Sequence, residues 1–116
     1  MLTRLAAASS STSQLLATTR REGFHLFDEV YVSKERDFRK GVRVLLSLDL
    51  RKMPDPGKRD DGDYVISWVR RYGKGRVSYC SLGHEPSSYY NPLVLRQYLA
   101  GIQFALGDLE ADATPR

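Results

Sequence analysis

The segment Gly83-His84-Glu85 holds the side chain best suited to acid–base chemistry in this chain. A neutral imidazole can accept a proton near pH 7, and a nearby carboxylate can orient such a base. Adjacent residues on an extended chain point in opposite directions, so His84 and Glu85 need not touch each other. His84 is therefore a candidate general base or ligand, and the alternative is a surface or structural histidine.

Asp28 and Glu29 form a carboxylate pair among the aromatic residues Phe24, Phe27 and Tyr31. Carboxylates beside apolar groups can have a raised pKa and act as acid or base, or they can bind a metal or sugar hydroxyls. The alternative is a pair that caps a turn or joins a salt bridge. The segment SSYYN (87–91) adds hydroxyls, rings and an amide near His84, which suits either a sugar or packing on a following helix.

Cys80 and a basic hairpin complete the candidates. Cys80 lies in the middle of a predicted strand, whereas reactive cysteines favour sharp turns or helix N-termini, so we interpret it as a small packing residue. Bases alternate with aromatic residues nearby, at Arg70, Arg71, Lys74 and Arg76 and at Trp68, Tyr72 and Tyr79. This mixture can bind single strands of nucleic acid, but no RNA-binding signature accompanies it, and a solvated hairpin face is favoured.

Composition excludes several classes. The chain has 116 residues and a net charge of +4, and no apolar run approaches the length of a membrane span. One cysteine excludes an internal disulfide framework, and two distant histidines leave no metal-binding spacing. We therefore expect a cytoplasmic protein with no membrane partner, no metal and no cofactor.

The first 23 residues differ from the rest, because they are rich in Ser, Thr and Ala and lack acids up to Arg21. We expect a flexible leader over 1–23, and an organelle transit peptide is the alternative. The folded part is expected over 24–107, and 108–116 is expected to be a polar tail. Predicted elements are an extended piece at 24–32, strands at 42–50, 64–72 and 76–82, and a helix at 93–107 begun by Asn91 and Pro92. The helix has one apolar face made by Leu95, Tyr98, Leu99, Ile102, Ala105 and Leu106.

Four segments in this order resemble the C-terminal half of the ThuA-like family, which is associated with trehalose and related sugar utilisation. They are DEVY (28–31), VLLSLDL (44–50), SWVRRYGKGRVSYCSLGH (67–84) and LAGIQFALG (99–107). The most specific element is W-x-R-x-Y-G-K-G-R-V-x-Y-x-x-L-G-H, which ends at Leu82, Gly83 and His84. The resemblance covers about residues 24–107.

The resemblance implies an α/β fold, a partial flavodoxin-like sandwich similar to class I glutamine amidotransferases, with a β-hairpin and a C-terminal helix. No cysteine elbow is present, so glutamine hydrolysis is not expected. The early strands of such a domain would precede residue 24, so the chain resembles an N-terminally incomplete copy. A homo-oligomer through an open sheet edge would cover its apolar surfaces.

The function expected from the resemblance is a role in carbohydrate utilisation with a small-molecule carbohydrate partner. His84 and Glu29 are the candidate catalytic residues, and Asp28, Tyr31, Trp68 and Tyr90 are the candidate substrate-binding residues. The alternatives are a non-catalytic sugar-binding or interaction module and, least favoured, a basic nucleic-acid-binding domain.

Overall fold

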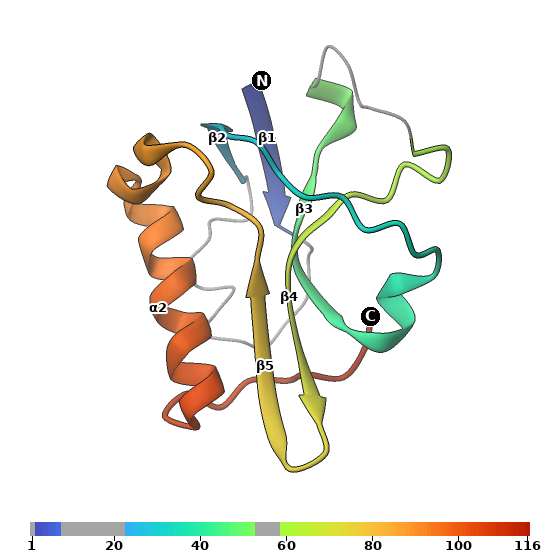
Figure 1. The fold of residues 1–116 in the computed structure, drawn as a ribbon, viewed down its shortest axis with the longest axis vertical. Helices are drawn as coiled ribbons and strands as arrows, with labels where there is room; N and C mark the ends of the chain where they lie inside the picture. Colours follow the sequence, from blue (N-terminus) through green and yellow to red (C-terminus); the bar gives the residue numbers. More distant parts are fainter. Residues whose placement is uncertain (1, 8–22, 53–58) are drawn as a thin grey trace.

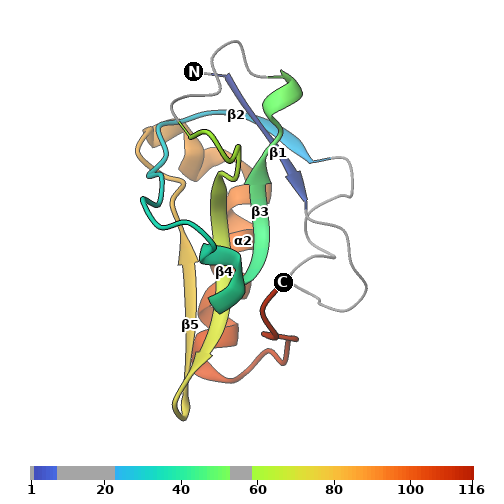
Figure 2. The same cartoon turned by 90° about the vertical axis from the view of Figure 1, so that its right-hand side faces the viewer.

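A computed structural model describes residues 2–7, 23–52 and 59–116 of the chain. Its five strands form one sheet in the order β2-β1-β3-β4-β5, and every described pair of neighbours is antiparallel. Helix α2 covers one face of this sheet (Figures 1 and 2). The elements are β1 (Leu2–Ala7), β2 (Phe24–Phe27), β3 (Arg43–Leu48), β4 (Val65–Tyr72), β5 (Gly75–Cys80) and α2 (Pro92–Leu106). Three 3-10 turns lie at Phe38–Gly41, Leu50–Lys52 and Pro86–Tyr90.

The chain is an α/β protein with the hairpin and the C-terminal helix that the sequence predicts. Its described strand pairs are antiparallel, whereas a flavodoxin-like sheet is parallel. The structure also differs from the flexible leader that was expected over 1–23, because Leu2–Ala7 forms strand β1 between β2 and β3. The remainder of that leader, at 8–22, lies outside the described residues.

The hairpin of β4 and β5 carries part of the candidate site described below. β4 is rich in β-branched and aromatic residues, which suits a pleated strand. The chain reverses at Gly73, where φ is +56°, a conformation that glycine adopts without strain. The register places Trp68 directly opposite Tyr79. Cross-strand neighbours share one face of a sheet, so these two rings lie together on the face away from α2.

Strand β3 is buried on both faces, as its run of apolar residues predicts. Its register with β4 shifts between Val44 and Leu46, which lets both Leu45 and Leu46 point into packed interior. Leu46 belongs to a cluster with Ile66, Leu82, Val94, Phe24 and Leu26. Leu45 belongs to a second cluster with Val69, Ala100 and Phe104.

Helix α2 begins and ends where the sequence predicts. The Asn91 side chain accepts a hydrogen bond from the N–H of Leu93 at 2.9 Å, and Gly107 ends the helix with φ of +91°. The interpretation of its apolar face is wrong, because the buried face is a different set: Val94, Gln97, Ala100, Gly101 and Phe104. Most of the predicted face, namely Leu95, Leu99, Ile102, Ala105 and Leu106, is exposed, and Tyr98 is half-buried.

Small residues and one paired amide explain this choice of face. A Cβ at Gly101 would lie 2.5 Å from Ser78 Oγ, so the helix backbone approaches β5 more closely than a larger residue would allow. The buried Gln97 amide donates a hydrogen bond to Ser67 Oγ at 3.0 Å. A buried polar group is tolerated when it has a hydrogen-bond partner, so Gln97 does not prevent burial of this face. The close approach that Gly101 allows therefore decides which face packs on the sheet, although the opposite face carries larger apolar side chains.

The segment 108–116 packs against the fold. Leu109, Ala111 and Ala113 are half-buried on the second cluster. The N–H of Arg116 donates to the Val42 carbonyl at 3.0 Å, so the C-terminus lies beside the start of β3 (Figure 2). The apolar residues at alternate positions therefore make the tail part of the layer that covers the sheet.

Candidate functional site

The Asp28 carboxylate fastens the loop that carries His84. Asp28 follows β2 and is 2% exposed. Its Oδ2 accepts hydrogen bonds from Gly83 N–H and Ser88 Oγ, both at 2.6 Å. Its Oδ1 accepts from the N–H groups of Glu85 and Glu29, both at 2.9 Å. One side chain thus joins the end of β2 to the loop after β5, although the two segments lie over fifty residues apart in sequence.

Hydrogen bonding keeps this buried group charged. Burial by itself raises the pKa of the Asp28 carboxyl, but the hydrogen bonds from Ser88, Gly83, Glu85 and Glu29 outweigh it. The resulting pKa lies below the ordinary value. Asp28 is therefore a charged structural anchor, and it holds Glu29 and His84 on either side of one opening.

Glu29 and His84 face each other across that opening. His84 Nε2 lies 3.6 Å from Glu29 Oε2, and both side chains are exposed. They border a cavity of about 450 Å³ whose lining residues come from the segment after β2 and from the end of β5. The lining residues are Glu29, Val30, Tyr31, Tyr79, Cys80, Ser81, Leu82, Gly83 and His84. The sequence predicts three of them as site residues: Glu29, Tyr31 and His84.

Two further lining residues, Ser81 and Tyr79, are not among the predicted catalytic and substrate-binding residues. Ser81 is buried, and within the described part of the chain its Oγ has no hydrogen-bond partner. Tyr79 stacks on Trp68, with ring centroids 5.2 Å apart and planes 18° apart, and Phe38 packs edge-on against the same indole. The predicted hairpin could have identified Tyr79, because a turn at GKG pairs it with Trp68. Ser81 gives no comparable signal, because a serine at the end of a strand is ordinary.

The remaining predicted residues have other positions. Asp28 lies under the loop with its oxygens occupied, so it does not line the cavity. Trp68 stacks on the Tyr79 ring but is not itself among the lining residues. Tyr90 is 84% exposed and also lies outside the lining. Burial raises the pKa of the Cys80 thiol, which agrees with a packing role.

Gly83 and Tyr98 fix the shape of the loop. Gly83 has φ of +108°, and a Cβ there would lie 2.6 Å from Tyr89 Oη. The Tyr98 hydroxyl of α2 donates to the Leu82 carbonyl, and the Tyr98 and Tyr89 rings stack 6.2 Å apart. Helix and loop are therefore joined at the residues immediately before His84.

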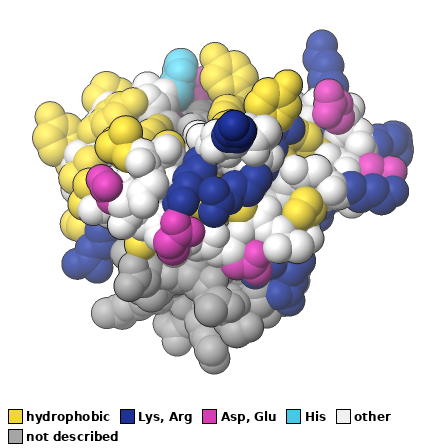
Figure 3. Space-filling model, turned by 90° about the horizontal axis from the view of Figure 1, so that it is seen from below, with side chains coloured by type: hydrophobic (Ala, Val, Ile, Leu, Met, Phe, Trp, Pro, Cys, Tyr) yellow, Lys and Arg dark blue, Asp and Glu magenta, His cyan; other side chains and the backbone are white. Residues whose placement is uncertain are grey.

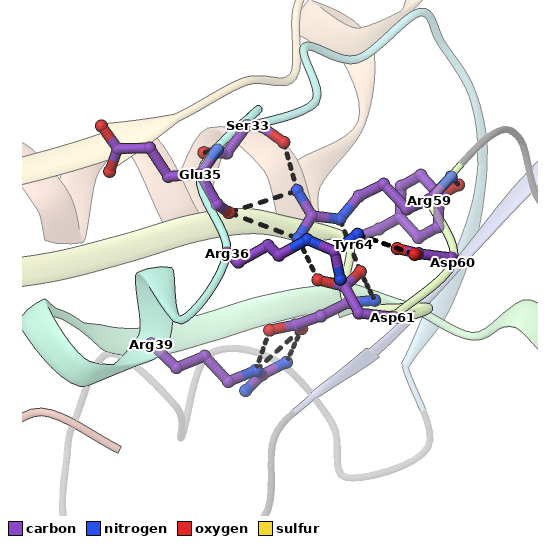
Figure 4. A network of polar contacts seen from close by, with 9 residues as sticks. Ser33, Glu35, Arg36, Arg39, Arg59, Asp60, Asp61 and Tyr64 are labelled. Carbon is purple, nitrogen blue, oxygen red and sulfur yellow. Dashed lines mark hydrogen bonds and ion pairs between the residues drawn. The ribbon is translucent and has the colours of Figure 1, made fainter.

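A second cavity, of about 500 Å³, is lined by residues from 32–36 and from 59–64. Arg59 is the most connected of its lining residues, because its guanidinium donates to the carbonyls of Ser33 and Glu35 and to the Asp61 carboxylate (Figure 4). The N–H donors of the Arg59 guanidinium are already used within the chain, so this side chain is not available for bidentate binding of an anion. This network braces the segment after β2 against the loop before β4.

Among the described residues no group of three or more His, Cys, Asp or Glu side chains could hold a metal ion. None of the helices described for this chain has the length and apolar character needed to cross a membrane.

Comparison with known proteins supplies one match. The family model ThuA, described as trehalose utilisation, matches residues 5–105. No curated protein and no solved structure matches the chain. The matched segment includes β2, the hairpin, the His84 loop and nearly all of α2, which are the elements that build the cavity. The chain therefore belongs to the ThuA family of trehalose-utilisation domains.

Proposed function

We propose that the cavity between Glu29 and His84 binds a carbohydrate, trehalose or a related glycoside. The observation that carries this proposal is a cavity bordered by the Tyr79 ring, by the exposed Glu29–His84 pair and by Ser81, whose buried hydroxyl has no partner in the described part of the chain. Buried polar atoms in proteins nearly always have a partner, so the unpaired hydroxyl of a residue that lines a cavity supports a ligand there. A sugar supplies what is missing, because it has hydroxyls for Ser81 and apolar faces for Tyr79. A volume of about 450 Å³ lies within the range of small-molecule sites.

His84 and Glu29 would act on a hydroxyl of the bound sugar. His84 Nε2 would accept the hydroxyl proton as a general base. The Glu29 carboxylate, 3.6 Å away, would stabilise the imidazolium that forms. Tyr79 would position the sugar ring, and Trp68 would hold Tyr79 in place from behind. The exposure of Glu29 and His84 leaves both groups accessible to a substrate entering from solvent.

A non-catalytic sugar-binding module is the second candidate. The only cysteine among the lining residues is Cys80, whose raised pKa disfavours the thiolate, so it is a poor nucleophile. The two candidates differ in the role of His84. An enzyme loses turnover when His84 is changed, whereas a binding module only changes its affinity.

Calorimetry with trehalose and its oxidised derivatives, combined with NMR detection of products, tests both. We expect Ser81→Ala to weaken binding about 2- to 10-fold, the range for one lost hydrogen bond. We expect Tyr79→Leu to weaken it by a similar factor, from lost contact of the sugar with the ring. The matched control is Tyr90→Leu, which removes an exposed tyrosine outside the lining and should leave affinity unchanged.

His84→Gln separates the candidates. Loss of turnover with affinity kept within a few-fold supports catalysis, and turnover absent in the parent chain supports binding alone. Failure of all these sugars to bind, or equal weakening by Tyr79→Leu and Tyr90→Leu, contradicts the proposed site.

Nucleic-acid binding is not favoured, because the basic hairpin has internal partners. Arg71 and Arg76 both pair with Glu110, and the Arg70 guanidinium lies 5.0 Å from the ring centre of Tyr72. A cytoplasmic location belongs to the same proposal.

A further inference from the structure

The outward face of α2 carries a row of large apolar side chains. Leu95, Leu99, Ile102 and Leu106 are between 46% and 73% exposed, and they lie on the side of the helix opposite the buried face. Hydrophobic side chains gather over the side of the molecule that α2 occupies, at the left of Figure 3. The outer face of a helix on a soluble domain is normally polar or charged. This row therefore indicates a surface that is covered in the working state of the protein.

The spacing of the row is that of a coiled-coil seam. Its members follow one another at intervals of four, three and four residues. These intervals alternate as the two core positions of a heptad do, and they form a narrow stripe that fits a single facing helix. We call these four residues the α2 seam.

We propose that two copies of this chain associate through the α2 seam, with the two helices antiparallel. The order four-three-four is the same in both directions, so an antiparallel second copy meets the seam in register. Leu99 then packs against Ile102 of the other copy, and Leu95 packs against its Leu106. A two-fold axis relates the pairs, which is the commonest symmetry of soluble oligomers.

The residues beside the seam favour a second copy over a charged partner. Tyr98, Gln103 and Ala105 flank it without charge, and Arg96 is the only charged residue of α2. Charged flanks normally select partner and orientation in helix pairs, and this helix presents almost none. In the antiparallel arrangement the two Arg96 side chains lie at opposite ends of the contact, so they do not repel each other.

A small groove extends the seam toward the sheet. It measures about 150 Å³ and lies between α2 and β5, where Tyr98, Ile102 and Ala105 border it. Ile102 is thus shared by the seam and the groove, so the apolar surface is continuous. The contact is still only one helix of 15 residues per copy, which is below the usual size of a stable interface. We therefore expect a weak dimer, with a dissociation constant in the micromolar range or above.

Sedimentation equilibrium of the full chain, from about 5 to 500 µM, tests the proposal. The average mass should rise from one chain toward two as the concentration increases. Leu99→Glu and Ile102→Lys should each hold the chain at the mass of a monomer, because each places a charge in the seam. Tyr72→Glu is the matched control, since it charges an exposed aromatic residue of the hairpin and should leave association unchanged.

Mixing the two seam variants tests the orientation. In antiparallel pairing the introduced Glu meets the introduced Lys, while Leu99 meets Ile102 on the other side, so an equimolar mixture should dimerise. In parallel pairing each charge meets an apolar residue, and the mixture should stay monomeric. Circular dichroism of each variant should match the parent, because these side chains are exposed.

Three results would overturn the proposal. One is a parent chain that stays monomeric across the range, and another is a dimer that survives both seam substitutions. The third is a monomer that binds vesicles of neutral phospholipid through these residues, which would assign the seam to a membrane surface. A dimer lost in both variants but not restored in their mixture would overturn the antiparallel register.

Discussion

Replacing Asp28 by Asn should destabilise the whole fold, because this carboxylate joins β2 to the loop that carries His84. The side chain is buried, and its two oxygens accept four hydrogen bonds of 2.6–2.9 Å. Asn has the same shape but only one accepting oxygen. The substitution therefore changes the hydrogen-bonding capacity of the site and leaves its volume unchanged.

The magnitude follows from the bonds that are lost. The amide oxygen of the introduced Asn can still accept from the N–H groups of Glu29 and Glu85. Its amide nitrogen then faces the N–H of Gly83, and because both groups are donors, neither has a hydrogen-bond partner there. A buried donor without a partner costs about 1–3 kcal/mol, and the charge-assisted bond to Ser88 also weakens. We expect Asp28→Asn to lower the free energy of unfolding by about 2–4 kcal/mol. That is a large part of the ~5–15 kcal/mol of a typical domain.

Urea unfolding at pH 7, followed by circular dichroism, measures the change. Asp60→Asn is the matched control, because Asp60 forms an exposed ion pair with Arg36. Exposed pairs contribute little, so this control should unfold with the parent. If Asp28→Asn also unfolds within error of the parent, the four hydrogen bonds do not stabilise the loop, and Asp28 is not its anchor.

Acid provides a second readout of the same group. The pKa of Asp28 in the folded chain lies below its ordinary value of 3.8. Its contribution is therefore present above the unfolded pKa and disappears as the pH falls through the lower folded pKa. The parent chain should lose stability below about pH 4, and Asp28→Asn should show a flatter dependence there. Parallel curves for the two proteins would contradict the assignment.

Three further predictions concern the elements around the site. Gly83→Ala should lower the melting temperature and abolish sugar binding, because its Cβ would lie 2.6 Å from Tyr89 Oη; an unchanged melting temperature would refute this. Burial raises the pKa of Tyr98 to about 12, so its stabilising contribution should disappear as the pH rises from 10 to 12. Alkaline unfolding of Tyr98→Phe should lack that component, as circular dichroism would show. Removing residues 108–116 should lower the urea midpoint, because the tail covers the cluster around Phe104; an unchanged midpoint would make the tail dispensable.

Local signals in the sequence predicted α2 and the hairpin, but not strand β1 at Leu2–Ala7, where a leader was expected. The Asn91 cap, the Pro92 start and the Gly107 end define α2 correctly, and the hairpin around Gly73 is confirmed. These features depend on residues close in sequence, so a single chain is enough to identify them. The apolar face of α2 was predicted wrongly, because both its faces carry apolar residues and only tertiary packing selects between them. The small residue Gly101 decides that choice by allowing close approach to Ser78.

The candidate site was predicted in part for a similar reason. Residue type and position in loops identified His84 and Glu29, and the fold places them 3.6 Å apart. The anchoring role of Asp28 depends on donors from a loop more than fifty residues away, and no local pattern reveals such a contact. Ser81 is a candidate only because burial leaves its hydroxyl without a partner in the described structure, and burial is a property of the assembled fold.

A titration of the ¹⁵N-labelled chain with trehalose and its oxidised derivatives, followed by the amide resonances, tests whether the cavity beside Glu29 and His84 binds a carbohydrate. The largest shifts should occur at residues 29–31 and 79–84, around the cavity, while the resonances of α2 and of the Arg59 network should stay in place. Titrations that move no resonance, or that move mainly residues 33–36 and 59–64, would contradict the proposed carbohydrate site.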